Sequence, residues 1–445
     1  MCVIDAAYAC PSGRVMYVRN NGVQISGFTL KRGSLLGGEW KFRTGTALLI
    51  HGDYCIIENL KCTENIQNEG GDLRPGVIAT AMAEGAALAG DYTIIRNVEI
   101  TRNTNSWSNP AGMAPYAIQL PTTNNLLANA KIYDNYNMGG VFAGCWNFSN
   151  VVFGTLVHTT RNKLNWRHHG LTASYAPTGQ AFVNCTVASC SGASYMALGQ
   201  SWDQPRYILN SMLGHSYEGA VTNNVYNDTY FKYNLIYDPN FAFDGDARRD
   251  GWGKTPVTGT NIQPATDPCL RNAPKRTDKA IADGTTTRIY VTKNAIYSVG
   301  DVIEVDWDKT ARTVTSLGSD STGPYIEFTP ALSSASTVYT FVDNWGSGKT
   351  SAQLADRNYT PLETSPLVNS GDLVDAATFK YVDVNQNGVY NPRYDVIVKL
   401  NGYTPTTNDW VVLTDLAGNP RVIGDSIDRG AYEYSPPRGT VIFFQ

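Results

Sequence analysis

A short pattern of apolar and polar positions recurs along the first half of the chain. Each copy reads apolar-apolar-x-Asn-apolar-x-apolar, with Gly in place of Asn in some copies. The copies follow one another at intervals of roughly 24 to 38 residues, which is typical of solenoids in which each repeat forms one turn. Their central residues are Gly27, Asn59, Asn97, Asn129, Gly154, Asn184, Asn210 and Asn234.

The residue at the centre of each copy indicates a sharp bend between two strands. Asn and Gly enter left-handed backbone conformations at low cost, and stacked Asn side chains can hydrogen-bond along the axis. We therefore predict an all-β fold, a right-handed parallel β-helix with short strands in every turn. An antiparallel sandwich is the alternative. The variable segments between nearly constant strand groups, and the lack of Asn-Gly or Asp-Gly hairpins between most copies, favour the β-helix.

Beyond Asn234 the pattern stops and the character of the chain changes. Residues 277–345 alternate like antiparallel strands bounded by Gly and Asp, as in TRIYVTKNAIYSVGDVIEVDW. We predict three parts: a β-helix over 1–276, a small inserted antiparallel β-domain over 277–345, and a segment over 346–445 that caps or completes the β-helix.

Composition narrows the classes of function. The chain has 445 residues and a net charge of −4, without a stripe of Lys and Arg, which argues against nucleic-acid binding. No apolar run approaches the roughly 18 residues of a membrane helix. The N-terminal residues 1–14 lack a signal core and read like the middle of a strand layer, so we expect a signal and an N-terminal cap upstream.

The eight cysteines show no zinc-type spacing. Cys62 and Cys185 fall on or beside inward repeat positions, so buried thiols are favoured over a disulfide framework. Pairing of Cys2 with Cys10, or of Cys185 with Cys190, stays open.

Four stretches carry a resemblance to a known family. They are GFTL at 27–30, DPCLRNAP at 267–274, TSPLVNSGD at 364–372 and TDLAGNPRVIGDSIDRGAYEY at 414–434. Together they resemble bacterial secreted right-handed β-helix repeat proteins of the pectate-lyase-like superfamily. The resemblance implies extracellular or cell-surface work on polysaccharides, and it carries no active-site signature.

In such a coil, side chains of neighbouring turns stack about 4.8 Å apart, so a groove site draws on several turns. The stacked segments expected there begin at 114, 139, 166, 194, 219 and 242. The richest cluster of cations lies within 161–170 and contains Lys163, Arg167, His168 and His169. Because adjacent strand residues face opposite sides, only one of the two histidines can line the groove.

This basic cluster suits β-elimination from a uronic-acid polysaccharide. A cation neutralises the carboxylate and acidifies C5–H, and a base removes that proton. Histidine suits proton transfer near neutral pH. The alternative is a basic turn that only solvates the coil.

A second cluster, within 243–254, holds Asp244, Asp246 and Asp250 together with Arg248 and Arg249. Paired carboxylates are what glycoside hydrolysis requires, and the same oxygens suit Ca²⁺. Local Asp–Arg pairs that stabilise a loop are the alternative.

Aromatic and polar residues between these clusters suit a sugar's apolar face and hydroxyl rim, although ordinary surface aromatics give the same pattern. They are Tyr195, Trp202, Asp203, Arg206 and His215.

Residues 383–388, DVNQNG, match the start of an EF-hand loop, with oxygen ligands at Asp383, Asn385 and Asn387. Position twelve is Tyr394, followed by Asp395, so a looser Ca²⁺ loop is what the sequence allows.

Serine-hydrolase, zincin, kinase and dehydrogenase motifs are missing from the sequence. The first interpretation is thus a polysaccharide lyase, with a glycoside hydrolase or a non-catalytic glycan-binding solenoid as alternatives. The oligomeric state stays open.

Overall fold

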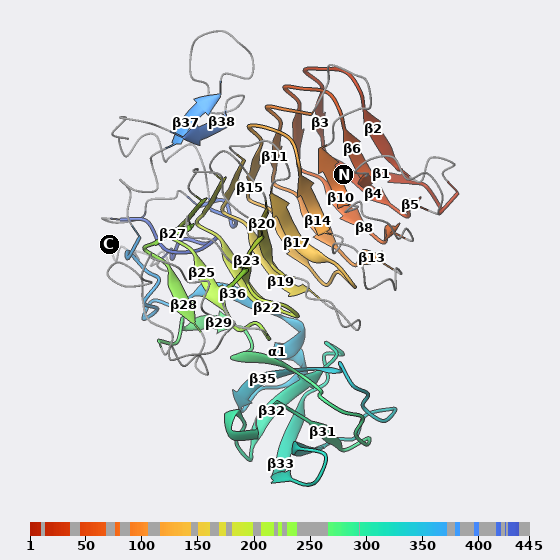
Figure 1. Ribbon diagram of the computed structural model, residues 1–445, viewed down its shortest axis with the longest axis vertical. Coiled ribbons are helices and arrows are strands. Elements are labelled where there is room, and N and C mark those ends of the chain that lie inside the picture. Colours follow the sequence, from red (N-terminus) through yellow and green to blue (C-terminus); the bar gives the residue numbers. More distant parts are fainter. Residues whose placement is uncertain are drawn as a thin grey trace, which may run out of the picture.

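The fold is described from a computed structural model (Figure 1). The structure describes residues 1–9, 14–35, 45–67, 76–80, 90–105, 116–143, 150–160, 169–174, 180–198, 206–217, 221–224, 229–237, 266–292, 294–371, 379–382, 396–399, 415–419, 423 and 426–435.

Three long parallel sheets form the body of the molecule. Sheet A contains, in spatial order, β1 (Cys2–Asp5), β4 (Phe28–Lys31), β8 (Lys61–Thr63), β12 (Glu99–Thr101), β16 (Lys131–Tyr133), β19 (Leu156–Thr160), β22 (Thr186–Cys190), β25 (Met212–Gly214) and β28 (Leu235–Tyr237). Sheet B contains β2 (Met16–Val18), β6 (Gly45–Ile50), β10 (Gly76–Thr80), β14 (Tyr116–Leu120), β17 (Gly139–Ala143), β20 (Leu171–Ser174), β23 (Tyr195–Leu198) and β26 (Val221–Asn224).

Sheet C contains β3 (Gln24–Ser26), β7 (Ile56–Glu58), β11 (Ile94–Arg96), β15 (Leu126–Ala128), β18 (Val151–Phe153), β21 (Gln180–Val183), β24 (Arg206–Leu209) and β27 (Thr229–Lys232). The chain visits sheets B, C and A in turn, and each strand pairs in parallel with its counterpart one turn later. Figure 1 shows these turns stacked along the coil. The fold is therefore the predicted right-handed parallel β-helix, and the sandwich alternative is wrong.

Apolar side chains from alternate strand positions fill the coil. In sheet A the inward column includes Leu30, Cys62, Ile100, Ile132 and Val157, all with no exposed surface. Each fully buried aliphatic side chain of this kind contributes about 1.5–3 kcal/mol. Because the side-chain period of a strand is two, this column fixes the register of every turn.

The corner between sheets C and A carries the repeated Asn or Gly. The backbone is left-handed at the first seven predicted positions, for example φ 55° at Asn59 and 83° at Gly27. The prediction for the eighth position is wrong by one residue. β24 pairs with β27 so that Leu209 lies beside Lys232, and the left-handed residue is therefore Tyr233 rather than Asn234. Asn234 lies one place further on, where its side chain donates to Ile208 O and accepts from Ser211 N.

A buried asparagine ladder stands at a different corner, after sheet A. Asn65 donates to Asn103 Oδ1 at 2.8 Å, and Asn103 donates to Asn135 Oδ1 at 2.9 Å. All three side chains have no exposed surface. At the predicted corner the pair Asn59 and Asn97 makes a longer contact, 3.4 Å. Asparagine side chains thus hydrogen-bond along the axis of the coil at both corners, and the shorter hydrogen bonds lie at the corner after sheet A.

The inserted domain is a six-stranded antiparallel sheet. Its order is β30 (Arg276–Lys279), β35 (Phe341–Ser347), β32 (Asp301–Val305), β33 (Arg312–Ser319), β34 (Pro324–Thr329) and β31 (Arg288–Tyr290). It has a core of its own around Ile303, Ile326 and Val342. The strands flanking the insertion, β29 (Leu270–Asn272) and β36 (Asn358–Pro361), pair with each other. This agrees with the predicted insertion and places its two ends side by side.

Described parts of the C-terminal segment pack on the outside of sheet A. Tyr359 and Ala431 contact Leu156 and Ala188, whereas Leu367 contacts Met212 and Leu235. The buried Arg429 donates to Asn234 O and Ser370 O. The second half of sheet A is thereby covered.

Cys62 and Cys185 have buried thiols in the coil, as predicted. Cys185 and Cys190 form no disulfide, so that alternative is wrong. Cys10 lies outside the described residues. The residues that the structure describes contain no helix long and apolar enough to cross a membrane.

Candidate functional site

Sheet B is the face on which the sequence predicts the groove. Five of the six stacked segments expected there supply strands β14, β17, β20, β23 and β26, which are consecutive neighbours in the sheet. Their stacking is confirmed. The sixth segment, from 242, lies outside the described residues.

The two edges of sheet B differ from the third corner of the coil. Sheets C and A are joined by a short turn in every repeat, such as Asn59 and Leu60 between β7 and β8. Joins into and out of sheet B vary widely, from 191–194 between β22 and β23 to 81–93 between β10 and β11. Variable insertions on one face of a solenoid are typical of a binding face.

The outward side chains of sheet B form an uncharged column. Register places Leu49, Ala79, Gln119, Phe142 and Thr172 one above another in successive strands. Leu49 with Ala79, and Tyr116 with Phe142, form small apolar clusters that are separate from the main core. All these side chains are buried although they face away from the coil's interior.

Tyr116 connects three strands of this face. Its ring lies against Gly139, where a β-carbon would come within 2.7 Å of the ring. The ring is tilted against Phe142 at 5.1 Å, and the hydroxyl donates to Thr172 Oγ1 at 3.1 Å. Gly139 therefore leaves the space that lets the tyrosine lie along the sheet.

Most of the predicted basic cluster falls outside the described residues. Lys163, Arg167 and His168 belong to the segment 161–168, which joins β19 to β20 at the edge of sheet B. His169 is described and is 1% exposed. Its Nδ1 accepts a hydrogen bond from Ala193 N at 3.0 Å. His169 therefore has a structural role, as was expected for one of the two histidines.

Two predicted sugar-contacting residues lie in the interior. Tyr195 has no exposed surface and packs edge-on against Phe182 and Phe231. His215 is 6% exposed at a left-handed corner, its ring lies 4.6 Å from that of Tyr237, and burial lowers its pKa to about 4. Side chains so enclosed cannot form an open sugar platform. The alternation that puts Gln119 outside puts Tyr195 inside.

The other predicted residues are placed only in part. Arg206 begins β24 of sheet C, and its side chain is outside the description. The remainder lie outside the described residues, namely Trp202, Asp203, Asp244, Asp246, Arg248, Arg249, Asp250, Asp383, Asn385, Asn387 and Asp395. Within the described part of the chain, no group of three His, Cys, Asp or Glu side chains is arranged to hold a metal ion.

A cluster of ionisable residues that the sequence patterns did not reveal lies on the outer face of sheet A. Glu99 accepts from Lys61 Nζ at 2.8 Å and from the Tyr133 hydroxyl at 2.5 Å. The Tyr133 ring stacks on His158 at 5.1 Å, and His158 contacts the Tyr359 ring at 4.6 Å. Lys61 and Glu99 lie two places after a corner residue, and Tyr133 and His158 lie four places after one. Aligning the repeats would therefore have placed these four residues in two neighbouring columns.

The electrostatics of this cluster favour fixed charge states. Burial alone would raise the pKa of Glu99, but the hydrogen bonds from Lys61 and Tyr133 outweigh it and the pKa is lowered. Burial and Glu99 raise the pKa of Tyr133, and burial lowers the pKa of His158 to about 3. At neutral pH the tyrosine is protonated and the histidine is neutral. The cluster is therefore a stable surface ladder rather than a proton-transfer site.

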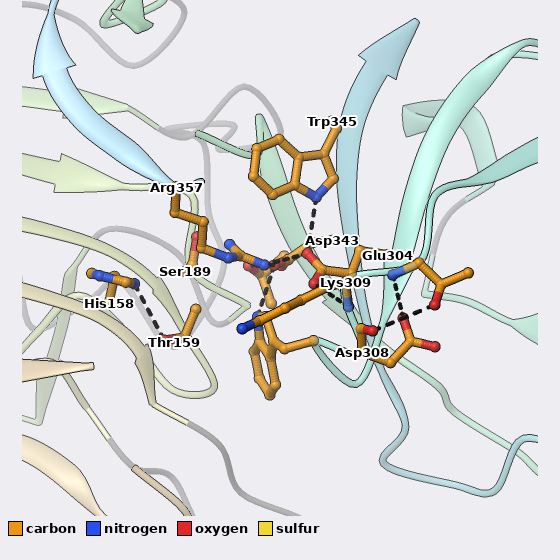
Figure 2. A network of polar contacts seen from close by, with 12 residues as sticks. His158, Thr159, Ser189, Glu304, Asp308, Lys309, Asp343, Trp345 and Arg357 are labelled. Carbon is orange, nitrogen blue, oxygen red and sulfur yellow. Dashed lines mark hydrogen bonds and ion pairs between the residues drawn. The ribbon is translucent and has the colours of Figure 1, made fainter. Parts of the chain in front are cut away.

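Beside it, the base of the inserted domain holds a buried ionic network (Figure 2). One nitrogen of Arg357 lies 2.5 Å from Glu304 and 2.7 Å from Asp343, whose carboxylates are 1% exposed or less. The indoles of Trp345 and Trp307 donate to Glu304 and Asp343 respectively. Burial raises the pKa of Glu304 to about 7. With its acceptors occupied by protein donors, this network is structural.

No family model matches the chain, and no curated protein matches it. One similar solved structure is the A-module of a mannuronan C-5 epimerase from Azotobacter vinelandii, with 12% identity over 53% of this chain and 77% of that chain and a TM-score of 0.25. Another is a tailspike protein of the Acinetobacter baumannii bacteriophage Fri1, described as a capsular polysaccharide depolymerase, with 10% identity over 74% of this chain and 68% of that chain and a TM-score of 0.26. The fold assignment rests on the strand pairing of this chain itself.

Proposed function

We propose that the protein acts outside the cell, where it binds an extended polysaccharide on the sheet B side of the coil, between the variable joins, and cleaves it. The observation that carries this proposal is the stack of in-register strands in sheet B, with joins of variable length at both of its edges. A polymer needs a long surface that repeats from turn to turn, and variable joins supply side chains specific to the ligand.

The favoured reaction is β-elimination from an acidic polysaccharide. Lys163 and Arg167 neutralise the uronate carboxylate, which stabilises the charge that develops when C5–H ionises. His168 takes the C5 proton, the C4–O bond breaks, a double bond forms between C4 and C5, and the protonated His168 returns the proton to the leaving oxygen. His169 is not assigned a chemical role, because its Nδ1 accepts from Ala193 N inside the coil.

Hydrolysis is the second candidate. Asp244, Asp246 and Asp250 lie in the segment that follows β28, and the basic segment follows β19. Both strands belong to sheet A and end at the same corner of the coil, which supports a shared groove. Two carboxylates there would serve as acid and base or nucleophile, and Arg248 and Arg249 would bind substrate.

Two segments of the chain are proposed as Ca²⁺ sites. Oxygen ligands at Asp383, Asn385, Asn387 and Asp395 suit a stabilising Ca²⁺ loop. Carboxylates of the 243–254 segment suit a Ca²⁺ that neutralises the substrate. Assays with and without added Ca²⁺ separate these roles, because the first changes the melting temperature and the second changes the rate.

The test follows ultraviolet absorbance of unsaturated products and, in parallel, reducing ends, on alginate, pectate and glycosaminoglycans. A rise in absorbance that His168→Ala abolishes supports the lyase. His169→Ala is the matched control, which lowers the melting temperature and leaves the remaining folded enzyme active. If reducing ends form without a rise in absorbance, the reaction is hydrolysis and the aspartates carry it. If the protein binds a polysaccharide without forming products, it is a glycan-binding solenoid. Absence of both products and binding overturns the proposal.

A further inference from the structure

The outward face of sheet B is open to solvent at its N-terminal end. Tyr17 in β2 pairs with Leu49 in β6, and Leu49 pairs with Ala79 in β10, so the three side chains form one outward column. Tyr17 is 46% exposed, whereas Leu49 and Ala79 are 1% exposed or less. A ligand can therefore reach this face at β2, the first strand of the sheet (Figure 1).

Two arginines and a histidine lie around Tyr17. Arg19 is two places beyond Tyr17, and His51 directly follows β6, where its N–H donates to Val18 O at 2.8 Å. The strand pairing thus continues past β2, which puts Arg19 and His51 on the outward side with Tyr17. The Tyr17 hydroxyl lies 2.8 Å from His51 Nδ1, and the guanidinium carbon of Arg14 lies 5.8 Å from the centre of the Tyr17 ring. His51 therefore holds the tyrosine ring in place beside the arginines.

The charges that act on this cluster are of one sign. Burial is the main cause that lowers the pKa of His51, and Arg14 and Arg19 lower it further. No carboxylate of the described residues opposes this shift. His51 is therefore neutral at neutral pH, and an anion bound beside it would be attracted by both guanidinium groups.

Arg19 is the arginine that is open to a ligand. It is exposed, and within the described part of the chain it forms no hydrogen bond or ion pair. Arg19 therefore keeps its guanidinium donors for a partner in solution. Neighbouring turns of the coil contain paired arginines instead, namely Arg32 with Asp5, Arg96 with Glu58 and Arg102 with Glu64.

We propose that Arg14, Tyr17, Arg19 and His51 form a subsite for an acidic sugar unit of the polysaccharide. The proposal rests on the proposed function and names the part of the ligand that binds at the N-terminal end of the coil. A guanidinium fork donates two parallel hydrogen bonds to the oxygens of an oxyanion, and the ring of Tyr17 packs against the sugar's C–H face. Uronate carboxylates and sulfate esters both supply such oxygens.

This subsite differs from a general attraction of polyanions. The whole chain carries a net charge of −4, so an acidic polymer is attracted only where cations gather on the surface. The ring of Tyr17 adds a contact that a polyanion without sugar rings does not use. We therefore expect polyglutamate to bind more weakly than an acidic polysaccharide.

The experiment compares Arg19→Gln with Arg102→Gln in the full chain, by calorimetry at low salt. Each variant removes one positive charge from an exposed arginine of the coil, and Arg102 lies after β12 of sheet A, where its side chain is 61% exposed. Neither change reaches the core, so both keep the melting temperature of wild type. Tyr17→Ala tests the ring. The probes are pectate, which carries carboxylates, dextran sulfate, which carries sulfate esters, uncharged dextran and polyglutamate.

We expect Arg19→Gln to weaken binding of pectate or dextran sulfate by about tenfold, and Arg102→Gln to weaken it by less than about twofold. A loss on either polymer supports the subsite: a loss confined to pectate assigns the carboxylate, and a loss confined to dextran sulfate assigns the sulfate ester. Tyr17→Ala weakens binding of the same polymer by about fivefold and leaves the binding of polyglutamate unchanged.

Three results overturn this inference alone. They are equal binding by wild type and Arg19→Gln or Tyr17→Ala, equal losses in Arg19→Gln and Arg102→Gln, and wild-type binding of uncharged dextran as tight as that of the acidic polymers. A wild type that binds neither these acidic polymers nor alginate and glycosaminoglycans overturns the inference together with the proposed function.

Discussion

The β-helix and the inserted domain pair their buried polar groups in different ways. In the coil, polar groups at the corners are neutral amides stacked in ladders, such as Asn65, Asn103 and Asn135. In the inserted domain, two buried carboxylates share one guanidinium. A repeating coil places like residues one above another, and stacked amides attract where stacked charges would repel. A domain without repeats can bring opposite charges together from distant strands.

Removing Arg357 gives the largest expected effect, because it leaves Glu304 and Asp343 buried without their cation. We expect Arg357→Met to lower the free energy of unfolding by about 3–5 kcal/mol, measured by urea titration. Arg288→Met is the control: its partners Asp320 and Glu327 are partly exposed, so the loss is about 0–1 kcal/mol. Equal losses in the two variants would contradict the distinction.

Breaking the amide ladder comes next. Asn103→Ala leaves the backbone N–H of Asn65 and the carbonyl groups of Cys62 and Thr101 without their side-chain partner, so we expect a loss of about 2–3 kcal/mol. Asn97→Gly, at a left-handed exposed corner, changes the unfolding free energy by only a few tenths. A result in which Asn97→Gly is the more damaging would place the main ladder at the other corner.

A smaller effect tests the register of the last turn. Asn234→Gly removes the bonds to Ile208 O and Ser211 N, and we expect a loss of about 1–2 kcal/mol in thermal or urea unfolding. Tyr233→Gly replaces a bulky residue whose backbone is left-handed, so we expect it to change the free energy of unfolding less than Asn234→Gly does. The reverse order would restore Asn234 as the corner residue.

The smallest expected effect is on the pH dependence of the free energy of unfolding. The folded state keeps His158 neutral down to pH about 3, whereas the unfolded chain takes up that proton near 6.5, so this residue's contribution to stability falls as pH drops below 6.5. Glu304 acts oppositely, because its folded pKa is about 7 and its contribution falls as pH rises from 4.5 through 7.

His158→Phe keeps a ring between Tyr133 and Tyr359 and removes one titration. Between pH 6.5 and 5 we expect its unfolding free energy to fall less steeply than that of wild type, by about 1 kcal/mol per pH unit. Urea midpoints across this range are the measurement. Parallel curves would mean that His158 is not held neutral.

Sequence patterns determined the fold better than the site. The period-two alternation and the left-handed corners are local properties, so the copies around Asn59 to Asn210 identified the coil, and the change of pattern identified the inserted domain. The misplacement at Asn234 arose because Tyr233 occupies a corner usually taken by Asn or Gly. Tyr195 and His215 were mistaken for surface residues because residue type does not reveal the direction of a strand side chain. The role of Glu99 was missed because its hydrogen-bond partners, Lys61 and Tyr133, lie one turn away.

Hydrogen–deuterium exchange, measured with and without a polysaccharide that the protein binds, shows directly which face of the coil the polymer covers. Binding on the sheet B side predicts slower exchange in peptides containing β14, β17, β20 and β23 and in the joins between them, with the sheet A peptides around Lys61, Glu99 and Tyr133 unchanged. Slower exchange in sheet A with no change in sheet B would contradict this prediction and would place the binding face on the surface ladder of sheet A.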